Sequence, residues 1–171
     1  MMAVLNIHAR HVGATQAQAG ALIDSLASDS DRLWPVDSWP AMRFDRPLGV
    51  GAVGGHGPVR YVVEQYQPGS WVRFRFTGPR GFDGFHEYTV HQLPDGSTGL
   101  RHLLAMHVHG SARLTWPLAY RWMHDALLED SLDRAESVLT GSVRSPARWS
   151  LLVRLLVRAV TLLQPKVSQS R

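Results

Sequence analysis

A chain of 171 residues with 44% hydrophobic residues and no cysteine can enclose one core, but it excludes disulfides, thiolate nucleophiles and zinc–thiolate sites. The net charge is +4, yet six of the 18 basic residues and none of the 14 acidic residues lie in residues 141–171. The remaining body is mildly acidic, which argues against a nucleic-acid-binding face, so we expect no nucleic-acid partner. The first residues lack a basic leader followed by a long apolar run, so we expect no signal peptide and a cytoplasmic protein.

Short β-like and helical segments alternate through the first half of the chain. A strand is predicted over 4–12, and Thr15 is a suitable N-cap for a helix reaching about Ser28. A turn over 29–34 and a glycine-rich loop over 49–57 interrupt the pattern. Apolar alternation then predicts several short strands that hairpin turns connect. Their predicted ranges are 39–44, 58–66, 71–76, 82–92 and 100–109.

Two helices are predicted in the last third of the chain. The longer one runs from Trp116 to Thr140 and stops at Gly141, because glycine readily adopts the left-handed C-cap conformation. Ser145 and Pro146 then predict the start of a final helix, which ends at Pro165. We therefore divide the chain into a ligand-binding domain, 1–140, and a basic amphipathic tail helix, 141–171.

This element order predicts an α+β fold with an antiparallel sheet and segregated helices. It resembles the START-like helix-grip superfamily, which includes polyketide cyclase/dehydrase and lipid-transport proteins. The segments that carry the resemblance are Val59-Arg60-Tyr61-Val62, His86-Glu87-Tyr88, Thr98-Gly99-Leu100-Arg101-His102, Trp116-Pro117, His124-Asp125 and Glu129-Asp130. The resemblance implies a curved sheet of about six to seven strands around the long helix, enclosing a cavity for an apolar or amphipathic molecule. It does not imply one reaction, because members include both enzymes and carriers.

The register of the 82–109 hairpin decides which side chains face the cavity. Paired residue numbers that sum to 192 separate apolar from polar side chains, whereas a sum of 191 mixes them. We therefore expect Tyr88 opposite Leu104 and His86 opposite Met106. The expected inner face holds Phe82, His86, Tyr88, Val90, Leu100, His102, Leu104, Met106 and Val108.

Three histidines, His86, His102 and His124, are expected at the cavity, the last of them within the apolar arc of the long helix. Each is either a core histidine bonded to a backbone carbonyl or to Tyr88, or a group that contacts ligand or transfers protons. We assign no catalytic residue, and these three histidines are the candidates. The predicted ligand-binding residues are Phe74, Phe76, His86, Tyr88, His102, Leu104, Met106, His124, Leu127 and Leu128.

Several other patterns do not support a cofactor or metal site. Residues 49–54 match G-x-G-x-x-G, but further glycines and Pro58 follow, so no helix can begin there to hold a nucleotide. His107, His109 and Asp83 share a solvated face, where histidines are ordinarily just exposed. We therefore predict no cofactor and no metal.

Two pairs of helical residues also require a choice. His124 and Asp125 are neighbours on a helix, so their side chains are expected to diverge by about 100° rather than form a relay. Asp130 and Arg134 are either an ordinary ion pair one turn apart or a pair at the cavity mouth.

The tail helix is amphipathic but does not suit a transmembrane span. Ser150, Arg154, Arg158 and Thr161 form a narrow polar stripe on an otherwise apolar helix over 147–163. Two arginines at mid-helix cost about 2.5–3.5 kcal/mol each in a bilayer, and the stretch is shorter than ~20 residues. The helix is instead expected to dock on its own body, lie in an anionic membrane surface, or pair between subunits.

Three functions are compatible with these features. The leading hypothesis is binding of a lipid or polyketide-like molecule in the cavity. The second is a polyketide cyclase/dehydratase-type enzyme with histidine acid–base groups, and the third is a membrane-peripheral interaction module that acts through the tail.

Overall fold

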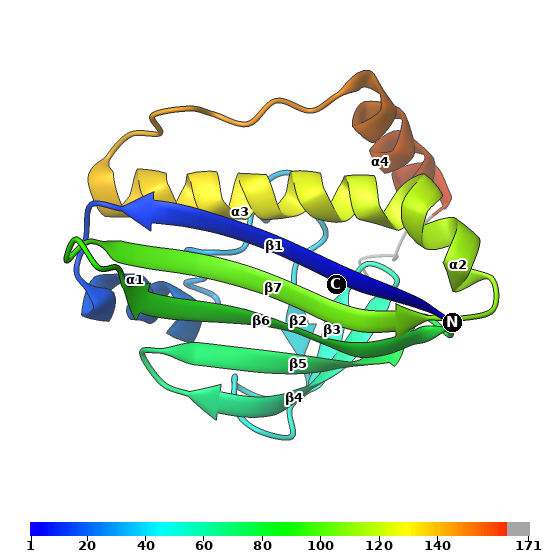
Figure 1. The fold of residues 1–171 in the computed structure, drawn as a ribbon, viewed down its shortest axis with the longest axis horizontal. Coiled ribbons are helices and arrows are strands. Elements are labelled where there is room, and N and C mark those ends of the chain that lie inside the picture. Colours follow the sequence, from blue (N-terminus) through cyan, green and yellow to red (C-terminus); the bar gives the residue numbers. More distant parts are fainter. Residues whose placement is uncertain (164–171) are drawn as a thin grey trace, which may run out of the picture.

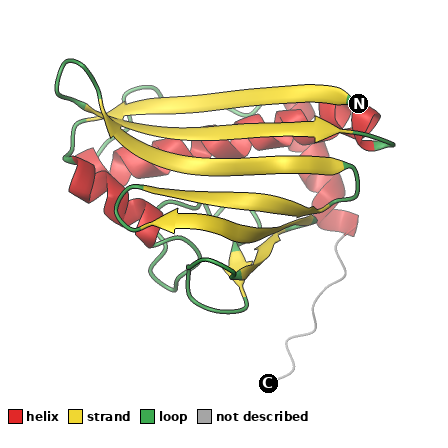
Figure 2. Cartoon of the chain, turned by 60° about the horizontal axis from the view of Figure 1, so that its bottom comes forward, coloured by secondary structure: helices red, strands yellow, loops and turns green. Residues whose placement is uncertain are grey.

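The chain folds as one antiparallel sheet with its helices gathered on one face (Figures 1 and 2). This computed structural model describes the backbone of residues 1–163 and the side chains of residues 1–160. The sheet has seven strands in the order β1-β7-β6-β5-β4-β3-β2. The strands are β1 (Met2–Val12), β2 (Arg43–Phe44), β3 (Val53–His56), β4 (Val59–Gln67), β5 (Trp71–Gly78), β6 (Phe82–Gln92) and β7 (Thr98–Val108). The predicted α+β class and antiparallel sheet are confirmed.

The helices are α1 (Gln16–Asp24), α2 (Ala112–Thr115), the π-helical turn η1 (Trp116–Tyr120), α3 (Arg121–Thr140) and α4 (Leu151–Leu163). The long helix thus begins four residues before the predicted Trp116, and the π turn accommodates Pro117, which has no N–H to donate. It ends as predicted at Gly141, whose φ of 80° is left-handed. The predicted Pro165 terminus lies outside the described residues.

Helix α1 begins with the predicted Thr15 cap. The Gln18 amide donates to the Thr15 hydroxyl at 3.2 Å, and the Thr15 amide donates to the Gln18 side chain at 2.9 Å, which completes a capping box. The helix ends at Asp24, before the predicted Ser28. There the Asp24 carboxylate accepts from the Gly69 amide at 2.9 Å, so α1 is fixed against the β4–β5 turn.

The β6–β7 hairpin keeps the predicted faces but not the predicted pairs. Paired residues sum to 190, so His86 lies opposite Leu104 and Tyr88 opposite His102. The cause is the turn: Leu93–Ser97 form the connection, and pairing resumes at Thr98, two residues before the predicted strand start. A shift of two residues preserves the alternation of side chains, so the predicted inner face remains inside.

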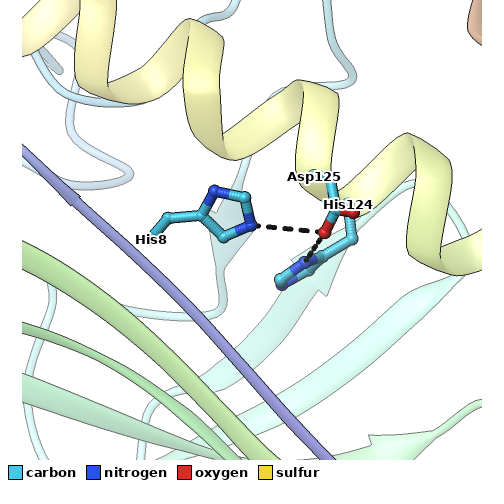
Figure 3. Close-up of side chains that lie close together, drawn as sticks. All are labelled: His8, His124 and Asp125. Carbon is cyan, nitrogen blue, oxygen red and sulfur yellow. Dashed lines mark hydrogen bonds and ion pairs between the residues drawn. The ribbon is translucent and has the colours of Figure 1, made fainter.

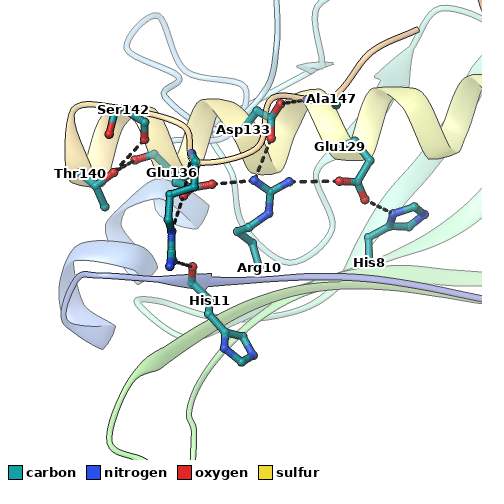
Figure 4. A network of polar contacts seen from close by, with 10 residues as sticks. His8, Arg10, His11, Glu129, Asp133, Glu136, Thr140, Ser142 and Ala147 are labelled. Carbon is teal, nitrogen blue, oxygen red and sulfur yellow. Dashed lines mark hydrogen bonds and ion pairs between the residues drawn. The ribbon is translucent and has the colours of Figure 1, made fainter. Parts of the chain in front are cut away.

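Arg10 of β1 holds α3 against the sheet (Figure 4). Its guanidinium lies 3.1 Å from Glu129, 2.8 Å from Asp133 and 2.7 Å from Glu136. These three acids follow one face of α3, and Glu136 is buried. Because an unpaired buried carboxylate is costly, this interaction fixes where α3 crosses the sheet edge.

The final helix begins at Leu151, not at the predicted Ser145-Pro146. Residues 141–150 instead run back along α3 in an extended connection (Figure 1), anchored by the Ala147 amide, which donates to Asp133 at 2.6 Å. Ser150 accepts from the Val153 amide at 3.2 Å and therefore caps α4. The tail thus docks partly on its own body, through the buried Val153.

Asp130 and Arg134 do not pair with each other, which corrects both readings of that pair. Asp130 accepts the indole N–H of Trp39 at 2.7 Å and that of Trp149 at 2.9 Å, while Arg134 binds Asp37 at 3.1 Å. The two indole rings pack with centroids 5.2 Å apart. Asp130 therefore joins the 35–40 loop to the connection that carries α4.

Within the described residues, no helix is long and apolar enough to span a bilayer.

Replacing Gly20 with alanine tests the packing of α1. Alanine is the better helix former by about 1 kcal/mol, but a Cβ at this buried position would overlap the backbone of Gly69. We expect Gly20→Ala to lower the free energy of unfolding in urea by about 1–3 kcal/mol, as overpacking does. An increase in stability would show that α1 does not pack against the β4–β5 turn.

Candidate functional site

A cavity of about 270 Å³ lies between the sheet and the helices. Its walls come from the inner face of β5–β7, from the long helix, from the β3–β4 turn at Gly57 and Pro58, and from α4 through Val160. The walls are mainly apolar, with few polar atoms, as is typical of sites for small molecules. Its further lining residues are Trp34, Trp39, Pro40, Val59, Phe82, Thr115, Trp116, Ala119, Tyr120 and Met123.

Seven of the ten predicted ligand-binding residues line this cavity. They are Phe76, His86, His102, Leu104, His124, Leu127 and Leu128. All three candidate histidines are among them, although they come from β6, β7 and α3. Side chains from the inner face of the hairpin and from the apolar arc of the helix thus line the same cavity.

Phe74, Tyr88 and Met106 face inward but do not line the cavity. Phe74 is fully buried and stacks on His86 with ring centroids 4.9 Å apart. The Tyr88 hydroxyl pairs with the Ser131 hydroxyl at 2.9 Å, and Ser131 in turn donates to the Leu33 carbonyl at 3.0 Å. Burial raises the pKa of Tyr88 far above its ordinary value, so it stays a neutral structural bridge.

Met106 belongs to a separate apolar cluster with Phe82 and Trp116. In the sheet, Phe74 pairs with His86 and Tyr88 with His102, and Met106 lies two residues after Leu104 on β7, so all three lie beside cavity-lining residues but are covered by packed side chains. The cavity occupies only part of the inner face, and packed side chains fill the remainder.

His86 and His102 form a buried hydrogen-bonded pair. His86 Nδ1 lies 3.2 Å from His102 Nε2, and neither outer nitrogen, His86 Nε2 or His102 Nδ1, has a hydrogen-bond partner among the described residues. Two neutral imidazoles share the one proton between them, so one outer nitrogen must be a donor and the other an acceptor. Exchange of tautomers swaps these two roles without creating charge.

Burial keeps these histidines uncharged. It lowers the pKa of His86 and of His102 well below 6.5, and nearby histidines add to the effect. The pKa of His124 is lowered as well, mainly by burial and against a smaller opposing contact with Asp125. Among the described residues, none of the three histidines forms the hydrogen bond to a backbone carbonyl or to Tyr88 that the core-histidine interpretation predicts.

His124 and Asp125 diverge less than expected from their positions on the helix. His124 Nδ1 is 3.8 Å from Asp125 Oδ1, beyond hydrogen-bond length but close enough for charge interaction (Figure 3). Both ring nitrogens of His124 are buried, and neither has a hydrogen-bond partner within the described part of the chain.

Sequence reasoning missed His56 as a cavity residue. It lies at the end of β3, inside the segment predicted to be a loop over 49–57, and its ring packs on Trp34 with centroids 4.6 Å apart. Burial lowers its pKa to about 3. The sequence gives only a weak signal for His56, because the four-residue strand β3 contains two glycines and is followed by a turn that begins with another glycine.

Comparisons with solved structures find the same fold. They include a truncated norcoclaurine synthase from Thalictrum flavum, with a TM-score of 0.61 and 13% identity over 81% of this chain and 95% of that one. Another is the di-domain ARO/CYC StfQ from the steffimycin biosynthetic pathway, with a TM-score of 0.61 and 11% identity over 81% of this chain and 51% of that one. CalU16 from Micromonospora echinospora has a TM-score of 0.54 and 12% identity over 92% of this chain and 83% of that one.

No protein-family model and no curated protein sequence matches the chain. Identities of 11–13% establish the fold alone. The chain therefore has the helix-grip fold that the sequence predicted, with a curved antiparallel sheet closed by a long helix.

Buried neutral histidines should make the protein sensitive to acid. The pKa of His56 is about 3 when folded and about 6.5 when unfolded, so its contribution is complete above pH ~6.5 and decreases as the pH falls toward 3. Between pH 7.5 and 5.0, we expect wild-type protein to lose about 2 kcal/mol more stability than His56→Gln.

Urea unfolding at the two pH values measures this difference. Wild type and His56→Gln contain the same carboxylates. The carboxylate contribution to the loss of stability therefore cancels when the losses of the two proteins are compared. Equal losses would mean that His56 is accessible to protons in the folded protein.

Proposed function

We propose that the chain binds a small, uncharged, mainly hydrophobic molecule in the cavity, and that the His86–His102 pair recognises a hydroxyl or carbonyl group on it. The supporting observation is that both histidines line an otherwise apolar cavity and that their outer nitrogens, which neighbouring side chains cover, have no hydrogen-bond partner among the described residues. Buried polar atoms are normally hydrogen-bonded, and a ligand that supplies a donor or an acceptor satisfies them.

The charge of the site limits the ligand class. Among the described residues, no guanidinium or ammonium group lines the cavity, and the histidines there are held neutral by burial. A carboxylate or phosphate would enter without a counter-charge, at a high desolvation cost. The ligand is therefore an alcohol, phenol or ketone with a compact apolar body, which includes lipid-like and polyketide-like molecules.

The volume limits the ligand further. A space of about 270 Å³ is near the lower end of ordinary ligand pockets, which run from ~300 to 1,000 Å³. A bicyclic or tricyclic skeleton fits such a space, and a long acyl chain does not.

A cyclase/dehydratase-type activity is the second candidate, and the same histidine pair favours it. When one outer nitrogen accepts a proton and the other releases one, the shared proton shifts along the 3.2 Å hydrogen bond and no ion forms. Enolisation of a bound ketone needs such paired transfers. Solvent deuterium exchange into 2-tetralone, with His102→Gln as the comparison, separates this activity from binding alone.

Binding of two matched ligands tests the proposed recognition. 2-Naphthol and 2-methylnaphthalene differ by a hydroxyl in place of a methyl group. We expect wild-type protein to prefer the naphthol by about tenfold, since one net hydrogen bond contributes about 1 kcal/mol or somewhat more. His102→Leu should remove this preference and retain the affinity for 2-methylnaphthalene.

Fluorescence titration measures both ligands, and mass spectrometry of organic extracts identifies any molecule that co-purifies. Ala119→Phe, which fills the cavity, should weaken both ligands at least tenfold, while Ala17→Phe on the exposed face of α1 should not. Equal affinities in wild type and Ala119→Phe would place binding outside the cavity.

We propose in addition that α4 contacts an anionic membrane surface. Val153 and Val160 face the body, but Leu151, Leu152 and Leu155 are 76%, 42% and 63% exposed. Arg154 and Arg158 are exposed beside these leucines. An apolar strip flanked by cations matches the boundary between acyl chains and anionic headgroups.

Flotation with vesicles that contain phosphatidylserine tests this contact. The double variant Leu151→Glu/Leu155→Glu should lose most vesicle binding, since it removes apolar area and adds like charge. The control Ile7→Glu alters another exposed apolar residue, on β1, and should bind as wild type does. Equal partitioning of all three proteins would exclude α4 as the contact.

A further inference from the structure

A second cluster of polar side chains lies where β1 crosses the start of α3 (Figure 3). His8 comes from the middle of β1, and His124 and Asp125 come from the N-terminal end of α3. One ligand atom from each residue lies within 4.8 Å of the other two. The sequence spacing gave no indication of this cluster, because His8 and His124 are 116 positions apart.

The distances suit a small cation. His8 Nε2 is 3.2 Å from Asp125 Oδ1, and His124 Nδ1 is 3.8 Å from the same oxygen. Ligand atoms bound to one zinc ion at about 2.0–2.2 Å in tetrahedral geometry lie about 3.3–3.5 Å apart. Two of the three pairs therefore lie near the spacing of zinc ligands, while the two imidazole nitrogens lie within 4.8 Å of each other.

The other nitrogen of His8 has the partner that a metal-binding histidine usually has. Its Nδ1 lies 2.7 Å from Glu129 Oε1, and Glu129 is held in turn by Arg10 at 3.1 Å. With Nδ1–H donating to Glu129, a neutral His8 directs a lone pair from Nε2 toward the Asp125 carboxylate. Two lone pairs at 3.2 Å repel unless a proton or a metal ion lies between them.

The local charges leave room for that positive charge. Four carboxylates line this face of α3: Asp125, Glu129, Asp133 and Glu136. Three guanidiniums lie beside them. Arg10 pairs with Asp133 and Glu136, Arg144 pairs with Glu136, and Arg121 lies 3.7 Å from Asp125. One negative charge remains, and a proton on His8 is one way to balance it. Burial lowers the pKa of His8, but its bonds to Asp125 and Glu129 outweigh this effect and raise it.

His124 distinguishes a metal from a proton. A proton shared by His8 and Asp125 leaves both buried nitrogens of His124 without a hydrogen-bond partner in the described chain. A metal ion bonded to His124 Nδ1 gives that nitrogen a partner and holds the ring in the cavity wall. Two imidazoles and one carboxylate suit zinc and neighbouring first-row divalent ions, and not magnesium or calcium.

We propose that His8, His124 and Asp125 form a site for a divalent transition-metal ion of the zinc class, with Glu129 orienting His8. This site is distinct from the proposed ligand recognition by His86 and His102 and is tested without any cavity ligand. The fourth position, which no described side chain occupies in this cluster, would hold water or a group that reaches it from the cavity.

Calorimetric titration of the full-length, tag-free, chelator-treated protein with Zn²⁺ tests the proposal, with Co²⁺ absorption as a report of coordination geometry. We expect one zinc per chain. Asp125→Asn and His8→Ala should weaken binding by about 100-fold or more, and Glu129→Gln by about 10–100-fold, the usual effect of an outer partner. Circular dichroism shows whether each variant is folded. If His8→Ala does not fold, the near-isosteric Asp125→Asn still tests the proposal.

His107→Ala is the matched control, because His107 is exposed on β7 opposite Asp83 and belongs to the alternative cluster on the solvated face. It should bind zinc as wild type does. Absence of zinc binding, unchanged binding in Asp125→Asn, or loss of binding in His107→Ala would each overturn the proposal.

Discussion

The contact between Arg10 and the acidic face of α3 determines the geometry on which the rest of the structure depends. One guanidinium on the edge strand reaches Glu129, Asp133 and Glu136, and Glu136 is buried. Since the helix cannot move away from β1 without leaving these charges unpaired, the separation of helix and sheet is set at that edge. The cavity exists because the side chains between them do not fill the space so defined.

Two kinds of polar chemistry lie beside α3 at different depths. Toward the sheet edge, acidic groups of α3 meet His8 and Arg10, where charge is balanced by pairing. Deeper inside, His86 and His102 are neutral and hydrogen-bond mainly to each other. His124 lies between the two groups, with ring centroids 6.1 Å from His8 and 5.3 Å from His102. A change of charge at the edge is therefore felt electrostatically by the cavity wall.

Periodicity predicted the parts of the site that lie on regular elements. Alternation in β6 and β7 identified His86 and His102, and the helical arc identified His124, because side-chain direction follows from the backbone period. The turn connection set the hairpin register two residues from the expected one, which changed partners but not faces. Residues that reach the cavity from an irregular segment, such as Trp39, or from a strand of only four residues, such as His56, carry no usable period, so only the tertiary structure reveals them.

The position of Val160 on the cavity wall has a further consequence for α4. This residue lies on the cavity wall, while the opposite side of the same helix presents leucines to the exterior. A ligand that displaced Val160 would shift α4, and a partner that bound the outer leucines more tightly in one position of α4 would favour that position. By reciprocity of coupled equilibria, each event changes the affinity of the other by the same factor.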